Sequence, residues 1–415
     1  MQDKIFKEYL DLLKKAVSFR SVSTDGVFKG EVEKCFNWYS DLFKRNGFKV
    51  KTLQNKNLNN ILFAEYNVGA KETCLIYGHY DVQPADIKDG WQEDPFKLVF
   101  KNNRLIARGV VDNKGQNLIH IVSILNLIKQ NKLKYNVKFL LEGDEETGSE
   151  GLDKIIKTNK QLLASDFVLI SDGEVFKNNP CIEVGFRGTF NATLTIKTAD
   201  NDLHSGIYGG FAKNAILELC RILCKMYRKD GKVAIKNFYK DVDRIPKNIK
   251  DEFQIKTGLL PCIEFTGIQG GYTKQGYKNA IPATAFAKVN FRLVEKQSPQ
   301  KVAKYFVDFI KQNISKEVKY KVKIEGLNKP LKINVNNKYV ERAREVLESV
   351  WKKKVVFKYV GGSLPITNYF HDILKTPLVM APLANEDCNM HGVNENFNID
   401  FIRKGIDFSL KFLGR

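Results

Sequence analysis

The sequence predicts an α/β fold: a mostly parallel sheet with helices on both faces, interrupted by an inserted α+β domain. Over residues 1–184, short apolar segments of strand length alternate with helical patterns, as in a sheet covered by helices. Over residues 185–332 the pattern changes to longer strands in which apolar and polar residues alternate. Over residues 333–415 the first pattern returns. We therefore expect two domains, one built from both ends of the chain and one from its middle.

The first segment begins with two amphipathic helices and continues with four apolar strands. Apolar residues recur at helical spacing over residues 5–17 and again over residues 32–43. The strands are short apolar runs, typical of buried parallel sheets, and lie at residues 61–66, 74–77, 137–141 and 167–170. A turn-rich excursion covers residues 86–108, an apolar helix follows over residues 116–128, and a further helix begins near residue 150.

The middle segment combines alternating strands with two helices. The strands are expected at residues 190–196, 284–294 and 318–325, and the helices at residues 212–227 and 299–312. Because side chains alternate along a strand, Val289 and Phe291 share one face and Arg292 lies on the other. Residues 228–256 are irregular and basic.

The final segment returns to alternating helices and strands. Helices are expected at residues 339–351, 364–374 and 399–413, with strands at 355–359 and 377–380. We expect these elements to complete the sheet of the first segment.

Composition excludes several classes of protein. The chain has 415 residues, 43% of them hydrophobic, and its seven cysteines include no CxxC pair, which favours a reducing cytoplasm over a disulfide framework. The first 15 residues are amphipathic without a leader-like apolar core, and no apolar run is long enough to span a membrane. The net charge is +20, but the lysines are spread along the whole chain. We therefore expect no nucleic-acid and no membrane partner.

His79 and Asp81 follow the strand at residues 74–77. On an extended backbone they point to the same side, at the carboxyl end of the strand, where open α/β sheets bind ligands. One interpretation is a metal ligand beside an orienting or acid–base carboxylate. The other is a strand-end turn with a capping aspartate, and the motif alone favours this second interpretation.

Acidic residues lie after the other strands of the first segment. Asp112 precedes a helix and is also explained as its N-cap, and Asp172 is also explained as a turn former. Glu145 and Glu146 belong to an acidic run that is usually a solvated loop, but here it ends an apolar strand. Like charges at a half-buried sheet edge are costly unless a cation neutralises them.

The chain has five histidines, and not all of them are candidates. His391, like His79, lies beside an acid in a glycine-containing loop after a strand, whereas His120 and His371 lie in apolar helical contexts and are expected to be structural. Two histidines and several carboxylates on strand-end loops have the composition of a dinuclear site for zinc, manganese or cobalt. In such a site one carboxylate bridges the ions, and one of two adjacent glutamates can act as general base.

The motifs occur in the order found in a known family. They are GHYDVQP, RGVVDNKG, EGDEETGS, SDGE, VGFRGT, DLHSGIYGG, FRLV and GGSLP. Together they resemble the dinuclear-metal peptidase family that includes carnosinase and cytosolic non-specific dipeptidase, with acetylornithine deacetylase and succinyl-diaminopimelate desuccinylase as more distant members. The resemblance covers nearly the whole chain.

The resemblance implies a role for each candidate in a catalytic domain formed by residues 1–184 and 333–415. It implies two divalent ions, Zn²⁺ or Mn²⁺ with Co²⁺ as a further option. It implies that His79 and Asp172 bind one ion, that Glu146 and His391 bind the other, and that Asp112 bridges both. It also implies that Glu145 is the general base and that Asp81 orients His79.

Residues 185–332 resemble the lid and dimerisation domain of the family. His204 matches a lid histidine that reaches the active site of a partner subunit and polarises the scissile carbonyl. The positions that match substrate contacts are Asn279, Arg292, Gly362 and Ser363. The resemblance thus implies a homodimer.

These features predict a cytoplasmic hydrolase that cleaves the amide bond of dipeptides or short peptides with a free C-terminal carboxylate. Glu145 would deprotonate a metal-bridging water, and Arg292 would bind the substrate carboxylate. Two departures from the dipeptidase pattern, Asn113 where a second Asp is common and Asn279 where Thr is common, leave the substrate open. The first alternative is an N-acyl amino acid deacylase that releases acetyl or succinyl groups. The second is a binding protein on the same fold without activity.

Overall fold

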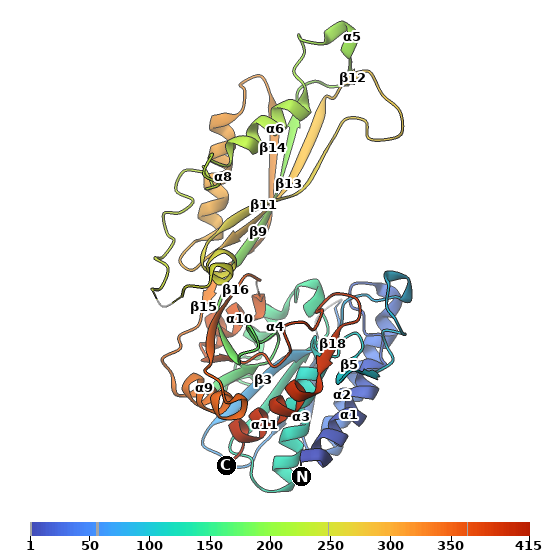
Figure 1. The fold of residues 1–415 in the computed structure, drawn as a ribbon, viewed down its shortest axis with the longest axis vertical. Helices are drawn as coiled ribbons and strands as arrows, with labels where there is room; N and C mark the ends of the chain where they lie inside the picture. The colour runs from blue at the N-terminus through green and yellow to red at the C-terminus, as the bar shows by residue number, and fades with distance from the viewer. Residues whose placement is uncertain (1, 55–57, 248, 363) are drawn as a thin grey trace. The chain divides into compact units, whose positions relative to one another are not determined.

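The computed structural model describes residues 2–54, 58–247, 249–362 and 364–415. The chain divides into two compact units (Figure 1). The first unit comprises Met1–Val184, Ile333–Lys358 and Pro365–Arg415, and the second comprises Gly185–Lys332 and Tyr359–Leu364. The short segment Tyr359–Leu364 therefore groups with the middle of the chain rather than with its C-terminal part.

A six-stranded sheet forms the centre of the first unit. Its order is β1 (Lys49–Leu53), β2 (Ile61–Tyr66), β6 (Asn136–Glu142), β3 (Thr73–His79), β7 (Phe167–Ile170) and β17 (Leu378–Met380). Strands β6, β3, β7 and β17 run parallel, and β1 and β2 form an antiparallel edge. The predicted fold class, a mostly parallel sheet with helices, is confirmed.

The sheet register shows that helices cover both of its faces. Phe139 of β6 pairs with Ile76 of β3, and Phe167 of β7 pairs with Cys74, so both phenylalanines lie on the same face. They contact α2 (Lys29–Arg45) through Phe43, α9 (Lys338–Trp351) through Tyr339 and α11 (Ile399–Leu413) through Phe412. On the other face, Tyr77 contacts Phe370 of the π-helical turn Phe370–Leu374.

Helix α3 (Lys114–Lys129) lies at the centre of the first unit and is buried along almost its whole length. It packs against α1 (Gln2–Val17), α11 and strand β3. Its apolar residues are spread around the helix rather than confined to one face, and its buried polar residues, such as Asn117 and His120, make hydrogen bonds inside the unit. Its first turn, which follows Asp112, is thereby held beside the end of β3.

The turn-rich excursion contains a β-hairpin that the sequence interpretation missed. Strands β4 (Val99–Lys101) and β5 (Arg104–Ile106) are joined by Asn102 and Asn103, both with positive φ, and β5 also pairs with β18 (Asn396–Asn398). Two asparagines in the left-handed region are typical of a tight hairpin turn, so the Asn-Asn pair was the available signal.

Two expectations for the C-terminal part were wrong. Strand β16 (Val356–Val360) does not join the six-stranded sheet but a three-stranded one with β8 (Cys181–Phe186) and β15 (Leu331–Lys332). The single helix expected at residues 364–374 is divided into α10 (Pro365–Tyr369) and the π-helical turn that follows. The remaining short elements of the first unit are α4 (Leu152–Thr158) and the 3-10 turns Gly26–Phe28, Ile87–Asp89 and Glu145–Thr147.

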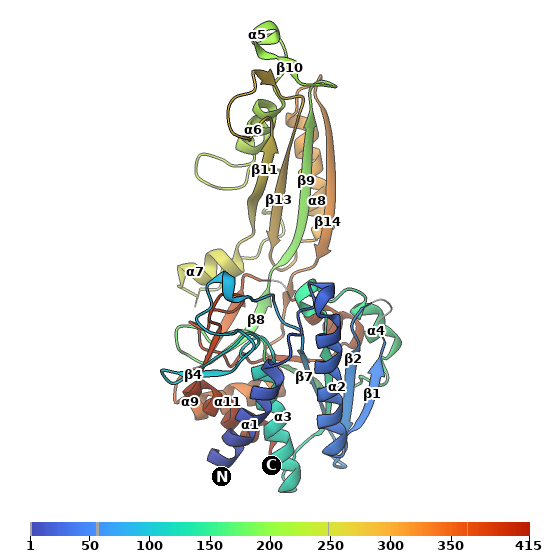
Figure 2. The ribbon, with the colours of Figure 1, turned by 90° about the vertical axis from the view of Figure 1, so that its right-hand side faces the viewer.

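The second unit contains a four-stranded antiparallel sheet with two helices. The strand order is β11 (Cys262–Gly270), β13 (Thr284–Leu293), β9 (Gly188–Lys197) and β14 (Lys319–Asn328). Helices α6 (Ala215–Lys225) and α8 (Pro299–Asn313) pack on one face of this sheet (Figure 2). Buried residues alternate with more exposed ones along β13, as expected. On its buried face Phe291 stacks on Phe190 of β9, with the ring centroids 4.2 Å apart. The shorter elements are β10 (Leu203–His204), α5 (Ser205–Tyr208), α7 (Glu252–Gln254), the π-helical turn Ile255–Leu259 and β12 (Ala280–Ile281).

Among the residues that the structure describes, no helix is both long enough and apolar enough to span a bilayer.

Candidate metal centre

The carboxyl ends of the parallel strands bring the candidate ligands together. His79 is the last residue of β3, Glu145 and Glu146 lie in the 3-10 turn that follows β6, and Asp172 follows β7. Asp112 enters the same region immediately before α3. Strands that run parallel end at the same edge of a sheet, which explains why residues distant in sequence meet there.

Asp112 is shared by two histidines. Its Oδ1 lies 3.0 Å from His79 Nε2, and its Oδ2 lies 2.7 Å from His391 Nε2. Each histidine faces a second carboxylate: His79 Nε2 is 3.7 Å from Asp172 Oδ2, and His391 Nε2 is 3.4 Å from Glu146 Oε2. Two half-sites thus share the Asp112 carboxylate.

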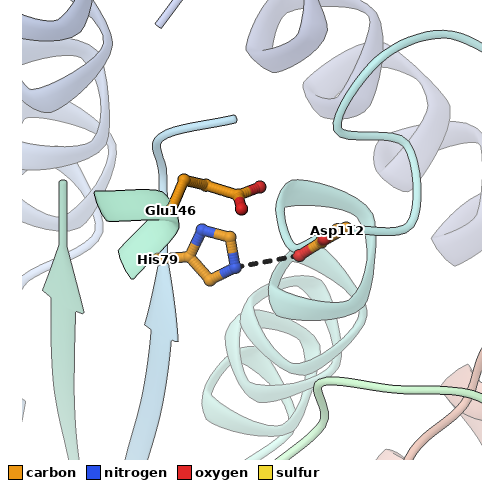
Figure 3. Close-up of side chains that lie close together, drawn as sticks. All are labelled: His79, Asp112 and Glu146. Carbon is orange, nitrogen blue, oxygen red and sulfur yellow. Dashed lines mark hydrogen bonds and ion pairs between the residues drawn. The ribbon is translucent and has the colours of Figure 1, made fainter. Parts of the chain in front are cut away.

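Figure 3 shows three of these side chains, His79, Asp112 and Glu146, converging from different elements. One potential ligand atom from each lies within 4.8 Å of the others. His79 is fully buried, and the Glu146 side chain is only 2% exposed, whereas the His391 side chain is 56% exposed. The cluster is therefore buried on the His79 side and accessible on the His391 side.

Asp81 connects His79 with the two glutamates. His79 Nδ1 lies 3.1 Å from the Asp81 carbonyl oxygen and 3.3 Å from its Oδ1, so Nδ1 carries the proton and Nε2 faces Asp112. The Asp81 carboxylate also accepts hydrogen bonds from the backbone N–H groups of Glu145 and Glu146. One buried carboxylate thus fixes both the histidine ring and the turn that presents the glutamates.

Burial and the charges of neighbouring carboxylates disfavour the ionised form of three carboxylates in the cluster. Burial raises the pKa of Glu145 to about 8 and that of Glu146 to about 7, and the charge of Asp112 acts in the same direction. Burial raises the pKa of Asp172 as well. These side chains, taken by themselves, hold more negative charge than the site can stabilise.

The two histidines partly offset this negative charge. Burial lowers the pKa of His79, but its hydrogen bonds to Asp112 and Asp81 outweigh that effect and raise it. The hydrogen bond to Asp112 raises the pKa of His391 to about 9. Burial raises the pKa of Asp112, yet its hydrogen bonds with both histidines bring the net value below the usual range.

The residues fit divalent cations. Two imidazoles face a group of carboxylates, namely Asp81, Asp112, Glu145, Glu146 and Asp172. Among the described residues, Glu146 Oε1 is buried without a hydrogen-bond partner. A buried oxygen with no partner, inside a cluster short of positive charge, is expected where a cation binds. Mixed imidazole and carboxylate donors suit zinc, manganese and cobalt.

Three residues make supporting contacts that the sequence interpretation did not identify, although it had noted Asn113 as a departure from the family pattern. Gln83 donates a hydrogen bond to Glu146 Oε2 at 2.7 Å, and the Ser23 hydroxyl donates to Asp81 Oδ2 at 2.6 Å. Asn113 Nδ2 donates to the carbonyl oxygen of Ser171 at 2.7 Å, and the Asp112–Asn113 peptide bond is cis. An ionised aspartate has no donor, so the departure to asparagine creates a link between the segments that carry Asp112 and Asp172.

The two histidines that were set aside make other contacts. Both ring nitrogens of buried His120 lie within hydrogen-bond distance of hydroxyl groups, 3.1 Å from Ser409 and 2.8 Å from Ser171. His371 is exposed and pairs with Asp372 at 3.0 Å.

Among the described residues, four predicted site residues belong to the second unit. Exposed His204 pairs with Ala280 between β10 and β12, and its Nδ1 accepts a hydrogen bond from the Gly206 backbone at the start of α5. The backbone N–H of Ser205 donates to Asn279 at 3.1 Å, so His204 and Asn279 are neighbours.

Arg292 and Gly362 lie elsewhere in that unit. Arg292 is half-buried on β13 opposite Cys262, and among the described residues its guanidinium has no carboxylate partner. The carbonyl of Gly362 accepts a hydrogen bond from the Arg187 backbone at 3.1 Å, and Arg187 Nε donates to the neighbouring Gly361 carbonyl. Ser363 lies outside the described residues.

Comparisons with known proteins cover nearly the whole chain. The chain is 27% identical to the Cys-Gly metallodipeptidase dug1 of Schizosaccharomyces pombe, over 97% of this chain and 94% of the relative. It is 30% identical to the Beta-Ala-His dipeptidase of Rattus norvegicus, over 81% of this chain and 76% of the relative.

Solved structures agree with these relatives. The fold matches an M20 family metallo-carboxypeptidase from Sulfolobus solfataricus with a TM-score of 0.86 and 28% identity, over 98% of each chain. It matches human carnosine dipeptidase 1 with a TM-score of 0.82 and 25% identity, over 99% of this chain and 98% of that one.

The sequence pattern of one protein family matches residues 75–415, which are most of the chain. This range contains the motifs that carried the resemblance, from GHYDVQP to GGSLP. The resemblance to a family of metal-dependent peptidases is therefore confirmed: the chain belongs to Peptidase family M20/M25/M40.

Proposed function

We propose that this protein is a metal-dependent dipeptidase that hydrolyses the amide bond of dipeptides or short peptides with a free C-terminal carboxylate. The observation that carries the proposal is the pair of half-sites that share Asp112, with Glu145 beside them. The relatives named as dipeptidases support the substrate class.

The chain's own residues divide into two sets of ligands. His79 and Asp172 would hold one divalent cation, Glu146 and His391 the other, and Asp112 both. When bound, the cations supply positive charge that lowers the pKa of water and polarises a carbonyl group. Zinc and manganese are the proposed metals, with cobalt as a further option.

Glu145 is the proposed general base. The backbone N–H of Glu145 donates a hydrogen bond to the Asp81 carboxylate. Among the described residues the Glu145 carboxylate has no hydrogen-bond partner, so that it is free to accept a proton from water. After attack on the carbonyl carbon, Glu145 would return the proton to the amine that leaves. A base of this kind contributes about 10²–10⁴-fold to the rate.

The second unit would bind the substrate. Arg292 is half-buried, and among the residues that the structure describes its guanidinium has no carboxylate partner, which suits bidentate binding of the substrate's terminal carboxylate. By the family resemblance, Asn279, Gly362 and Ser363 would contact the substrate, and His204 would polarise the scissile carbonyl.

We further propose a homodimer formed through the second unit, with His204 acting in the partner subunit. Support comes from large apolar side chains near His204 that are exposed in the single chain: Ile207 is 72% exposed and Phe211 89% exposed. Exposed apolar side chains grouped in this way are typical of protein interfaces. The proposed compartment is the cytoplasm, with no nucleic-acid or membrane partner.

A substrate panel tests the proposal. Metal-stripped protein would receive Zn²⁺ or Mn²⁺ and be assayed with free dipeptides, the same dipeptides amidated at the C-terminus, longer peptides, and N-acetyl and N-succinyl amino acids. We expect cleavage of free dipeptides only after metal is added. Arg292→Met should raise KM for free dipeptides and leave the amidated series unchanged.

Two adjacent variants separate the base from the ligand. Glu145→Gln should keep both metal ions and lose turnover, whereas Glu146→Gln should lose metal as well. Cleavage confined to acylated amino acids would assign the protein as a deacylase, and release of C-terminal residues from longer peptides alone would assign it as a carboxypeptidase. A protein that binds no divalent cation would refute the proposal.

A further inference from the structure

A buried ion pair lies behind the cluster. The Arg108 and Glu395 side chains are 3% and 0% exposed, and Arg108 Nη1 lies 2.8 Å from Glu395 Oε2. The two residues are 287 positions apart in sequence. Neither touches the imidazoles or carboxylates of the two half-sites in any described contact, so their role is not that of a ligand.

Glu395 holds the segment that carries Asp112. Its Oε2 accepts a hydrogen bond from the Gly109 backbone at 2.9 Å, and its Oε1 accepts from the backbones of Val111 and Asp112 at 2.8 and 3.1 Å. Each carboxylate oxygen of Glu395 thus accepts two hydrogen bonds, when the one from Arg108 is included. Four donors on one carboxylate fix the path of this segment up to the residue that bridges the half-sites.

Arg108 holds the segment that carries His391. Its Nη2 donates to the carbonyl oxygens of His391 at 3.2 Å and of Gly392 at 3.1 Å. His391 has a φ of 61°, in the left-handed region that residues with a side chain rarely adopt. A backbone in that region persists only where its surroundings fix it, and here the guanidinium supplies the contacts. The guanidinium also lies 5.3 Å from the Trp91 ring.

We propose that Arg108 and Glu395 are positioning residues that couple the Asp112 segment to the His391 segment, so that the carboxylate and the imidazole meet before a cation binds. The 2.7 Å contact between Asp112 Oδ2 and His391 Nε2 is the result of that coupling. The metal-affinity part of this inference rests on the proposed function, whereas the coupling of the two segments does not.

The first test measures hydrogen exchange in protein treated with a chelator. Glu395→Gln keeps the shape of the side chain but turns one acceptor into a donor that faces other donors. Exchange should accelerate in residues 109–112 and also in residues 389–393. The matched control is Asp387→Asn, since Asp387 pairs with Arg104 at 2.6 Å in the same region but is exposed. Acceleration in only one of the two segments would overturn the coupling.

The second test measures binding of Zn²⁺ or Mn²⁺ alone, by competition with a chelator, at a temperature where the variant is folded. In Glu395→Gln the affinity should fall about 10–100-fold, as is typical for residues that orient metal ligands, and kcat at saturating cation should fall much less. Asp387→Asn should bind the cation as the unmodified protein does. A purely structural role would lower the melting temperature and leave the affinity of the folded protein unchanged.

A conservative variant decides the matter if Glu395→Gln does not fold. Arg108→Lys keeps the charge beside Glu395 but lacks the planar fork that reaches both segments. Its affinity for the cation should still fall at least tenfold, and an affinity within twofold of the unmodified protein would overturn the proposal. An unmodified protein that takes up no cation would refute the proposed function, and the exchange experiment would still decide the coupling.

Discussion

Gly78 provides a test of how closely the cluster is packed from behind. It precedes His79, and a β-carbon at this position would lie 2.0 Å from Asn117 Oδ1 and 2.2 Å from Asn117 Nδ2. Asn117 is buried, and its Nδ2 donates to the His79 carbonyl oxygen at 3.1 Å. Gly78→Ala must therefore displace the Asn117 amide and break this hydrogen bond.

The expected cost combines two effects. Forcing an extra methyl group into a packed interior costs about 1–3 kcal/mol, and a buried polar group left without its partner costs about 1–3 kcal/mol. Since the displaced amide can regain part of its hydrogen bonding, we expect Gly78→Ala to lower the free energy of unfolding by about 2–4 kcal/mol. That is a large part of the about 5–15 kcal/mol by which proteins are stable.

Urea denaturation followed by tryptophan fluorescence measures this change in the right part of the chain. The three tryptophans, Trp38, Trp91 and Trp351, all belong to the first unit, so their fluorescence reports its unfolding. A chelator should be present, because bound cations would add their own stabilisation.

A double-mutant cycle with Asn117→Ala gives the decisive result. Asn117→Ala removes the group that the new methyl would displace, so the second substitution should cost much less in its presence, with an interaction energy of about 1–3 kcal/mol. Additive effects of the two substitutions would show that the amide does not limit the space at Gly78 and would refute the reasoning.

Three further predictions concern other buried polar groups of the first unit. Burial lowers the pKa of His120 to about 3 from 6.5, so between these values the unfolded chain binds a proton that the folded chain does not, and stability is lost as the pH falls. In His120→Gln the loss of unfolding free energy between pH 6.5 and pH 5 should be smaller by about 1.5 kcal/mol, and an unchanged slope in urea titrations would contradict this. Lys358→Met leaves buried Glu183 without the partner that now lies 3.2 Å away, and should cost about 3–5 kcal/mol. Adding Glu183→Leu should recover much of this loss in thermal unfolding, and no recovery would argue against the ion pair as its cause. Asn113→Asp replaces the donor to Ser171 with an acceptor and should destabilise the protein more at pH 8 than at pH 5, because protonation restores a donor. Equal losses at both pH values would rule out this explanation.

The regular elements with a strong pattern could be predicted from the sequence. Strand β2, strand β7 and helix α11 have the expected bounds, since short apolar runs and helical periodicity each reflect burial against a neighbour. Strand β11 was missed because most of its side chains are exposed and no alternation marks them. Strand β16 was assigned to the wrong sheet, because a pattern shows that a strand exists but not which strand it pairs with.

Part of the candidate site could also be predicted from the sequence, and part could not. The types and order of His79, Glu146 and Asp172 could be read from the ends of strands, because parallel strands deliver their last residues to one edge, and Asp112 could be read from its position before a helix. The sequence could not show which oxygen of Asp112 faces which histidine. Nor could it show Glu395, whose contacts with residues 109–112 join positions that are 283 to 286 residues apart.

The middle of the chain departs from the first unit and returns to it at adjacent points. The backbone N–H of Ile333 donates to the carbonyl of Val184 at 2.8 Å, and within the second unit Lys332 pairs with Gly185. The excursion of residues 185–332 therefore begins and ends at neighbouring residues, like a long loop on an otherwise closed fold. An insertion of this kind can lengthen, shorten or be exchanged during evolution without changing the order of the six strands.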